Sequence, residues 1–178
     1  MQAQFLERSA RALFAGGVLA LLASAPCAAA DGAAAGAPSI AVRIDGGKPV
    51  AFDAAALAAL PQHEVSAKAH GKTVACSGPN LFELAAKVGA PGGETLRGKS
   101  LDYAVRVGAA DGYHVVFALA ELDPAMRDAV PIVTARCNGA ALDEKDGPFR
   151  VVVPGDKRPA RWIRQVQGVE IFKVSAPP

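Results

Sequence analysis

The sequence lacks the short motifs that mark many enzymes and metal proteins. It has no C-x-x-C pair, no G-x-S-x-G nucleophile turn and no glycine-rich dinucleotide fingerprint. Its three histidines, His63, His70 and His114, lack the close spacing of a metal-ligand pair. These absences argue against a metal centre, serine-type nucleophilic catalysis and a dinucleotide-binding domain.

A charge excess of either sign is also missing. The 178 residues include 19 Lys and Arg and 17 Asp and Glu, so the formal net charge is +2. A nucleic-acid-binding protein needs a basic surface rather than one basic loop, so we expect no nucleic-acid partner. No apolar run is long enough for a comfortable bilayer crossing, and we expect no membrane span.

The first 30 residues have the pattern of a cleaved secretory signal peptide. Arg8 and Arg11 precede an apolar run, and a small-residue tract follows that ends at Ala30. Because the two arginines are not adjacent, the twin-arginine signal that exports folded proteins is missing. We therefore expect residues 1–30 to be removed and the protein to fold in the periplasm.

Residues 40–175 are expected to form a single α+β domain, mixed and rich in β structure, after a disordered linker at 31–39. An apolar stripe predicts a helix over residues 81–88, and a shorter helix is expected over 54–60. A helical turn is expected at 121–128. Alternating residues predict strands at 40–44, 50–52, 62–69, 72–76, 101–108, 113–119, 131–136 and 166–174.

Two cysteines remain after removal of the signal peptide, Cys76 and Cys137. In an oxidising compartment an even count favours a disulfide. The alternative is a pair of buried, unbonded thiols that pack as small apolar side chains. The sequence alone leaves both open.

The one dense cluster of charge follows an apolar strand and a Pro-Gly corner near the end of the chain. Its members are four cations and the only tryptophan: Lys157, Arg158, Arg161, Trp162 and Arg164. If a helical turn spans Arg161 and Arg164, both guanidinium groups point the same way and can grip a phosphate or a carboxylate. Trp162 can stack on a flat ring. The alternative is a solvated loop neutralised by nearby acids.

A second candidate group lies in the sequence Asp111-Gly112-Tyr113-His114, at the end of a predicted hairpin. Binding residues often lie at such ends, which makes Asp111 and Tyr113 candidate ligand contacts. The alternative is an ordinary turn in which Asp-Gly is favoured for its backbone angles.

The order of several short motifs resembles that in the sulfite-oxidase-type oxidoreductase molybdopterin-binding domain. The resemblance covers about residues 50–174. The motifs are Phe52-Asp53 through Leu60-Pro61, Ser77-Gly78-Pro79-Asn80-Leu81, Asp111-Gly112-Tyr113, Asn138-Gly139 and Gly147-Pro148 through Pro154 to Arg164. The resemblance implies a mixed, β-rich α+β fold. It also implies that Arg161 and Arg164 correspond to cations that hold the pterin phosphate.

The chain departs from this family at the metal ligand. In members that carry the cofactor, a cysteine about a dozen residues before the glycine that matches Gly78 binds molybdenum, whereas Ser66 or Ala67 lies there in this chain. Cys76 is too close to Gly78 to match. A hydroxyl is a poor substitute for a soft thiolate. We expect no bound cofactor, with molybdopterin as the alternative.

Three functions remain open, and with them the question of whether the chain is an enzyme. The predicted function is an exported, cofactor-free binding or accessory domain whose partner is a small anionic ligand or an exported redox partner. The second is a molybdopterin-dependent oxidoreductase with an unconventional metal ligand. The third is an interaction module that contacts an acidic partner. The predicted ligand contacts are Arg158, Arg161, Trp162, Arg164, Asp111 and Tyr113.

Overall fold

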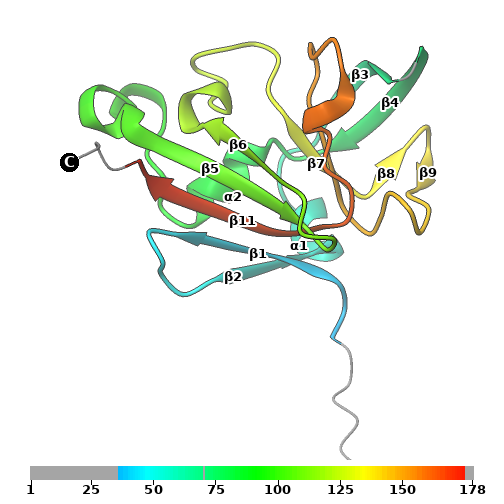
Figure 1. Cartoon of the computed structure of the whole chain (residues 1–178), viewed down its shortest axis with the longest axis horizontal. Coiled ribbons are helices and arrows are strands. Elements are labelled where there is room, and N and C mark those ends of the chain that lie inside the picture. The colour runs from blue at the N-terminus through cyan, green and yellow to red at the C-terminus, as the bar shows by residue number, and fades with distance from the viewer. Residues whose placement is uncertain (1–35, 70, 175–178) are drawn as a thin grey trace, which may run out of the picture. The chain divides into compact units, whose positions relative to one another are not determined.

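A computed structural model describes residues 36–69 and 71–174, which form a β-rich α+β structure with eleven strands and two α-helices (Figure 1). The predicted signal peptide and most of the predicted linker lie outside the described residues. In the described ranges, none of the helices has the length and apolar character that a membrane crossing requires.

A five-stranded sheet with the order β2-β1-β11-β5-β6 occupies the centre of the fold. Two antiparallel hairpins form its edges, β1 (Ser39–Ile44) with β2 (Val50–Asp53) and β5 (Tyr103–Ala109) with β6 (His114–Ala118). Between the hairpins lies β11 (Val166–Lys173), drawn in red in Figure 1, which runs parallel to β1 and antiparallel to β5. The last strand of the chain therefore joins the two halves of the sheet.

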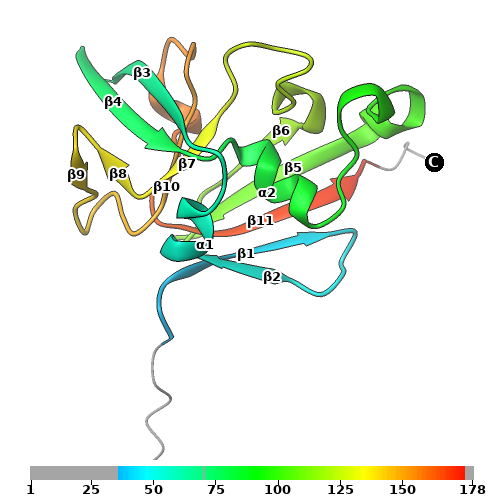
Figure 2. The same ribbon diagram turned by 180° about the vertical axis from the view of Figure 1, so that it is seen from behind.

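A smaller sheet has the order β3-β4-β8-β9. Its long hairpin consists of β3 (His63–Ala69) and β4 (Lys72–Gly78), which extends away from the five-stranded sheet in Figures 1 and 2. The short strands β8 (Arg136–Cys137) and β9 (Ala140–Ala141) extend the sheet beyond β4.

Two further strands and the helices connect these sheets. β7 (Ile132–Thr134) pairs with β10 (Arg150–Val152), and the α-helices are α1 (Ala54–Ala58) and α2 (Leu81–Lys87). Seen from behind, both α-helices lie in front of the five-stranded sheet (Figure 2). Within the described ranges there are also four short 3-10 helices: η1 (Gly93–Thr95), η2 (Gly98–Asp102), η3 (Leu119–Glu121) and η4 (Pro159–Arg161).

The hydrophobic core lies between the helices and one face of the five-stranded sheet. Strand side chains alternate between the two faces, and Ile40, Val42 and Val107 are fully buried on the core face. Leu81 and Leu84 of α2 are fully buried as well, which stabilises the fold by about 1.5–3 kcal/mol for each leucine. The apolar stripe of the predicted helix is thus the face that α2 buries.

The helix predictions are largely confirmed. The side chain of Asp53 accepts a hydrogen bond from the backbone N–H of Ala56 at 2.8 Å and so caps α1, which ends at Ala58, two residues before the predicted end. Asn80 occupies the N-cap position of α2, but its side chain makes no capping hydrogen bond. Within the predicted helical turn at 121–128, the backbone N–H groups of Met126 and Arg127 donate to the carbonyl oxygen of Asp123, and η3 shares only Glu121 with the predicted range.

One strand prediction is wrong, because residues 131–136 do not form a single strand. The hydroxyl of Thr134 donates to the carbonyl oxygen of Ser77 at 2.6 Å and accepts a hydrogen bond from the backbone N–H of Arg136 at 3.0 Å. These bonds fix a bend after Thr134. The chain therefore leaves β7 and enters β8, which belongs to a different sheet.

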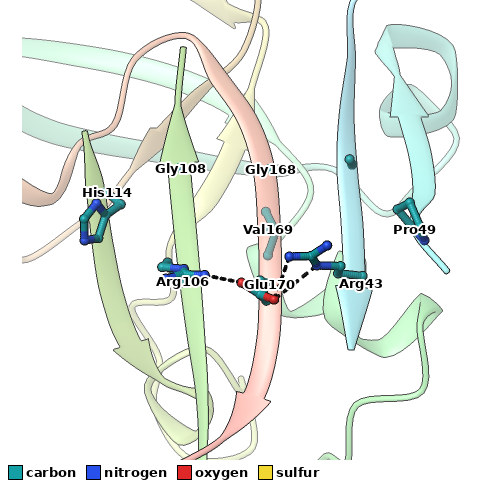
Figure 3. A pocket seen from close by; sticks show the side chains of 9 residues that line it. Arg43, Pro49, Arg106, Gly108, His114, Gly168, Val169 and Glu170 are labelled. Atoms are coloured by element: carbon teal, nitrogen blue, oxygen red, sulfur yellow. Dashed lines mark hydrogen bonds and ion pairs between the residues drawn. The ribbon is translucent and has the colours of Figure 1, made fainter. Parts of the chain in front are cut away.

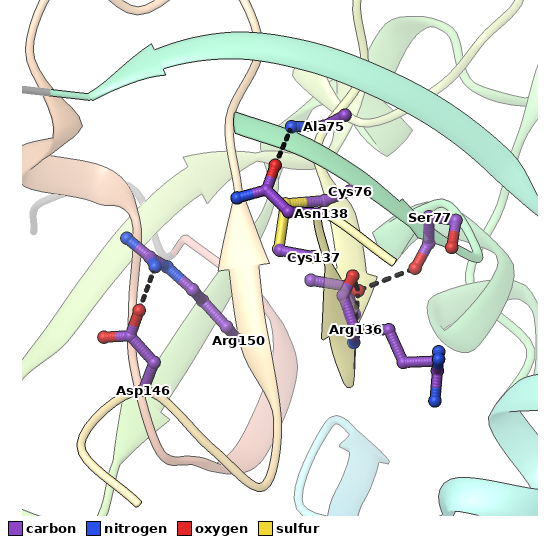
Figure 4. Close-up of a disulfide and its surroundings, with 9 residues drawn as sticks. Ala75, Cys76, Ser77, Arg136, Cys137, Asn138, Asp146 and Arg150 are labelled. Atoms are coloured by element: carbon purple, nitrogen blue, oxygen red, sulfur yellow. Dashed lines mark hydrogen bonds and ion pairs between the residues drawn. A yellow bond between two sulfur atoms is a disulfide. The ribbon is translucent and has the colours of Figure 1, made fainter. Parts of the chain in front are cut away.

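The two cysteines form a disulfide (Figure 4). Cys76 of β4 and Cys137 of β8 lie directly opposite each other in the antiparallel register. The disulfide prediction is therefore confirmed, and the alternative of two unbonded thiols is wrong.

Candidate functional site

An open cleft of about 1130 Å³ lies where the basic segment, residues 157–164, meets the β3–β4 hairpin and the loop before β10. The charged side chains that line it are Lys72, Asp111, Asp143, Lys145, Asp146, Arg150, Arg158 and Arg164. Five cations face three acids, so the lining has a net formal charge of +2. The cleft concentrates positive charge that the whole sequence, with its near balance, does not reveal.

Five of the six residues predicted as ligand contacts line this cleft: Asp111, Tyr113, Arg158, Trp162 and Arg164. The turn between β5 and β6 supplies Asp111 and Tyr113. The hydroxyl of Tyr113 donates a hydrogen bond to the carbonyl oxygen of Ala160 at 2.8 Å, which ties this turn to the basic segment. The fold thus brings together two candidate groups that lie almost 50 residues apart.

Arg161, the sixth predicted contact, does not line the cleft. Its guanidinium group makes two hydrogen bonds to Asp156, at 2.9 and 2.7 Å, and lies 3.5 Å from Glu121. It also lies over the ring of Phe117, 5.0 Å from the centroid. Hydrogen bonding to Asp156 is the main cause of the raised pKa of Arg161. The helical turn η4 ends at Arg161, and the structure separates this side chain from that of Arg164.

Trp162 forms part of the floor of the cleft. It is 5 % exposed, and its indole N–H donates to the carbonyl oxygen of Val153 at 3.0 Å. The guanidinium group of Arg150 lies over its ring, 5.4 Å from the centroid. Tyr113, which is 50 % exposed, is the aromatic ring of the cleft that a ligand reaches more easily.

Sequence reasoning missed three cations of the cleft, Lys72, Lys145 and Arg150. The Arg150 side chain is only 15 % exposed, and it forms an ion pair with Asp146. Its Nε is buried and has no hydrogen-bond partner among the described residues. A charged residue directly before the apolar run Val151–Val153 was the signal that could have identified Arg150.

Several cations of the cleft have no carboxylate partner. Within the described ranges, Lys72, Lys145 and Arg158 form no ion pair, and Arg164 approaches Asp146 only to 3.9 Å. Charge-assisted hydrogen bonds to phosphate or carboxylate are stronger than neutral ones. These side chains can therefore bind an anion without first breaking a close ion pair.

The residues present do not fit the ligation of molybdenum by a protein thiolate. Cys76 and Cys137 are bonded to each other, so neither offers a thiolate. Ser66 and Ala67, at the position implied by the resemblance, are absent from the cleft lining. Among the described residues there is also no group of three His, Cys, Asp or Glu side chains suited to a metal ion.

A second depression, of about 320 Å³, lies on the face of the five-stranded sheet opposite the core (Figure 3). Glu170 lies at its centre between two arginines. Its Oε1 accepts from Arg43 at 2.8 and 3.1 Å, and its Oε2 accepts from Arg106. These bonds, first of all the one from Arg106, lower the pKa of Glu170. Both arginines of the depression are thus already paired with the same carboxylate. We call this Arg43–Glu170–Arg106 group the charge ladder.

This ladder predicts a pH-dependent loss of stability in Glu170→Gln. At pH 7 we expect the variant to lose about 1 kcal/mol of unfolding free energy. Because folding lowers the pKa of Glu170, its contribution is present above the unfolded pKa of about 4.3 and disappears as the pH falls through the folded value. Urea unfolding at pH 7 and near pH 3 measures the difference, which should be smaller at the lower pH.

Glu94→Gln is the matched control for this prediction. Glu94 is exposed and forms no ion pair within the described part of the chain, so its substitution should change stability little at either pH. If the loss of unfolding free energy in Glu170→Gln is the same at pH 7 and pH 3, the ion pairs of the charge ladder do not stabilise the fold.

Comparison with known proteins adds a fold likeness. No protein-family model matches the chain, and no curated protein matches it. Among solved structures, the sulfane dehydrogenase SoxCD from Paracoccus pantotrophus matches 76 % of this chain with a TM-score of 0.58 and 19 % sequence identity. This chain shares its fold with part of the SoxCD chain. The match covers only 38 % of the SoxCD chain, so the likeness concerns well under half of that protein. The prediction of a mixed, β-rich α+β fold is confirmed.

Proposed function

We propose that this protein is a member of the sulfite-oxidase-type molybdopterin-binding family that lacks the metal ligand and binds a small anionic ligand in the cleft. The order of the sequence motifs and the fold likeness to a sulfane dehydrogenase support the family. The pattern of residues 1–30 supports a periplasmic location. The observation that carries the anion proposal is the group of cleft cations without a close carboxylate partner.

The cleft suits an organic phosphate or carboxylate better than a bare inorganic ion. Arg158 and Arg164 present planar guanidinium groups, which bind such oxyanions through two parallel hydrogen bonds. Tyr113 lines the same cleft and offers an exposed ring for a flat ligand group. The volume of about 1130 Å³ leaves room for more than the anionic group alone.

If the cleft binds an anion, the double variant Arg158→Ala/Arg164→Ala should lose ligand affinity. We expect phenyl phosphate to raise the melting temperature of the parent protein and to bind the double variant at least about tenfold more weakly, because two charge-assisted contacts are lost. Isothermal titration calorimetry at low ionic strength measures the affinity. The same titration with inorganic phosphate shows what the ring contributes.

Two variants separate this result from general damage. Arg97→Ala removes an exposed arginine that does not line the cleft and should leave binding unchanged. Arg161→Ala should lower stability, because it breaks the bonds to Asp156, but keep the affinity of the parent. The proposal is wrong if the parent does not bind phenyl phosphate, or if the parent and the double variant bind it equally well. Either result would favour contact with an acidic protein partner.

A molybdopterin-dependent oxidoreductase is the second candidate, and the fold likeness to a dehydrogenase favours it. Elemental analysis of protein isolated from its native compartment distinguishes the two candidates. Stoichiometric molybdenum with pterin fluorescence would establish the second. Protein that binds phenyl phosphate and contains no molybdenum agrees with the first.

A further inference from the structure

The strand β3 has a free edge. It is the outermost strand of the sheet β3-β4-β8-β9, so one side of its backbone has no partner strand among the described residues. A free edge presents N–H and C=O groups to which another strand can pair. The hydrogen bonds of the neighbouring strand show which residues of β3 present them.

Ala75 in β4 fixes this orientation (Figure 4). Its carbonyl oxygen accepts from the backbone N–H of Asn138 at 2.6 Å, and its N–H donates to Oδ1 of Asn138 at 3.0 Å. The backbone groups of Ala75 therefore point away from β3. Ser66, which lies opposite Ala75 in the register, must form a non-hydrogen-bonded pair with it. The N–H and C=O of Ser66 therefore point to the free edge.

Glu64 and Lys68 share this orientation, because backbone direction in a strand alternates with a period of two. The side chains of Glu64, Ser66 and Lys68 lie on one face, and all three residues are exposed. Neither Glu64 nor Lys68 has an ion-pair partner in the part of the chain that the structure describes. The free edge thus carries a carboxylate, a hydroxyl and an ammonium group, each two residues from the next.

We propose that two copies of this protein pair through β3, antiparallel and about a two-fold axis at Ser66. In this register Glu64 of each copy faces Lys68 of the other, and the two Ser66 residues face each other. The edge groups of all three positions then bond across the axis, which is the self-complementary contact that two-fold symmetry requires. The two small sheets become one continuous sheet.

The charge order selects this register. Charges on an edge strand usually prevent pairing, and a lysine alone would do so here. Because the sign reverses across Ser66, antiparallel pairing of two copies sets opposite charges face to face, which stabilises a strand pair. Parallel pairing in register would set Glu64 against Glu64 and Lys68 against Lys68, which destabilises it.

The surface beside the first half of β3 carries acidic charge that a lysine of the second copy can meet. A depression of about 340 Å³ lies along the first half of the strand, and its lining includes Glu64 and Asp128. Lys68 of a second copy arrives at this end and meets both carboxylates. Asn80 lines the same depression, is 4 % exposed, and its side chain has no hydrogen-bond partner among the described residues.

Charge exchange tests the proposal. Sedimentation velocity over a concentration series should show the parent protein in a reversible monomer–dimer equilibrium. Glu64→Lys and Lys68→Glu should each raise the dimer dissociation constant by about tenfold or more, because each places like charges opposite each other twice. The double variant Glu64→Lys/Lys68→Glu restores opposite charges and should return to within about threefold of the parent.

Three further variants make the test decisive. Glu94→Lys and Lys99→Glu carry the same charge changes at exposed positions away from β3 and should not affect dimerisation. Ser66→Pro removes an edge N–H that β4 does not use, so it should abolish the dimer and keep the circular dichroism spectrum of the folded protein. A parent that stays monomeric at all concentrations, a double variant as monomeric as the single ones, or a Ser66→Pro dimer would overturn the proposal.

The pairing surface is separate from the anion-binding cleft. None of Glu64, Ser66 and Lys68 lines the cleft, so the charge-exchange variants should bind phenyl phosphate as the parent does. Loss of dimerisation with retained ligand affinity, or the reverse, therefore reports on one proposal alone.

Discussion

Gly78→Ala is expected to destabilise the protein by more than about 3 kcal/mol, among the largest effects of a single methyl group. A Cβ at this position would lie 1.9 Å from the carbonyl oxygen of Val133 and 2.9 Å from its carbonyl carbon. Both are backbone atoms next to the β4–β7 contact, so no side-chain rotation can relieve the overlap. Equilibrium urea unfolding of the parent and the variant measures the loss.

Gly108→Ala is the matched control. Gly108 also lies in a strand, and a Cβ there would meet nothing within 4 Å. Because alanine restricts the unfolded chain more than glycine does, we expect this variant to be neutral or more stable by up to about 1 kcal/mol. A Gly78→Ala protein as stable as Gly108→Ala would show that β4 and β7 do not approach as closely as the structure places them.

Removal of the disulfide is expected to cost about 4 kcal/mol of unfolding free energy. The bond joins Cys76 and Cys137 across 61 residues of sequence, and loop-closure entropy of the unfolded chain grows with that separation. Cys76→Ala/Cys137→Ala is the appropriate variant, because Cys76 is buried and a serine hydroxyl would lack a partner there. Urea unfolding without reductant measures the difference from the parent.

Reductant supplies the internal control for this prediction. Adding it should lower the stability of the parent toward that of the double variant and leave the variant unchanged. A parent insensitive to reductant, together with free thiols at both cysteines by mass mapping, would show that the two residues are not bonded in solution.

Local elements of the fold could be predicted because their causes are local. The stripe of Leu81 and Leu84 has helical spacing, and Asp111-Gly112 is a strong hairpin signal that lies between β5 and β6. The strand partners could not be predicted in this way. The parallel pairing of β1 with β11 joins residues more than 100 positions apart, and no short-range pattern encodes it.

In the candidate site, too, local patterns could be predicted and contacts between distant segments could not. Two members of the charge cluster, Arg158 and Arg164, line the cleft. The different place of Arg161 depends on Asp156 and Glu121, and the second of these lies 40 residues earlier in the sequence. Sequence spacing can place two arginines on one helical face, but it cannot show which of them an acid from another segment neutralises.

The central place of β11 has a consequence for how the protein forms. β1 pairs with β2 across a short turn, whereas its other partner, Val166–Lys173, must reach it from the far end of the described chain. Until then β1 has β2 on one side and nothing on the other, so the edge that later pairs with β11 stays open. Native contacts this distant in sequence close slowly. Until β11 folds against it, β1 therefore has an edge to which another strand can pair.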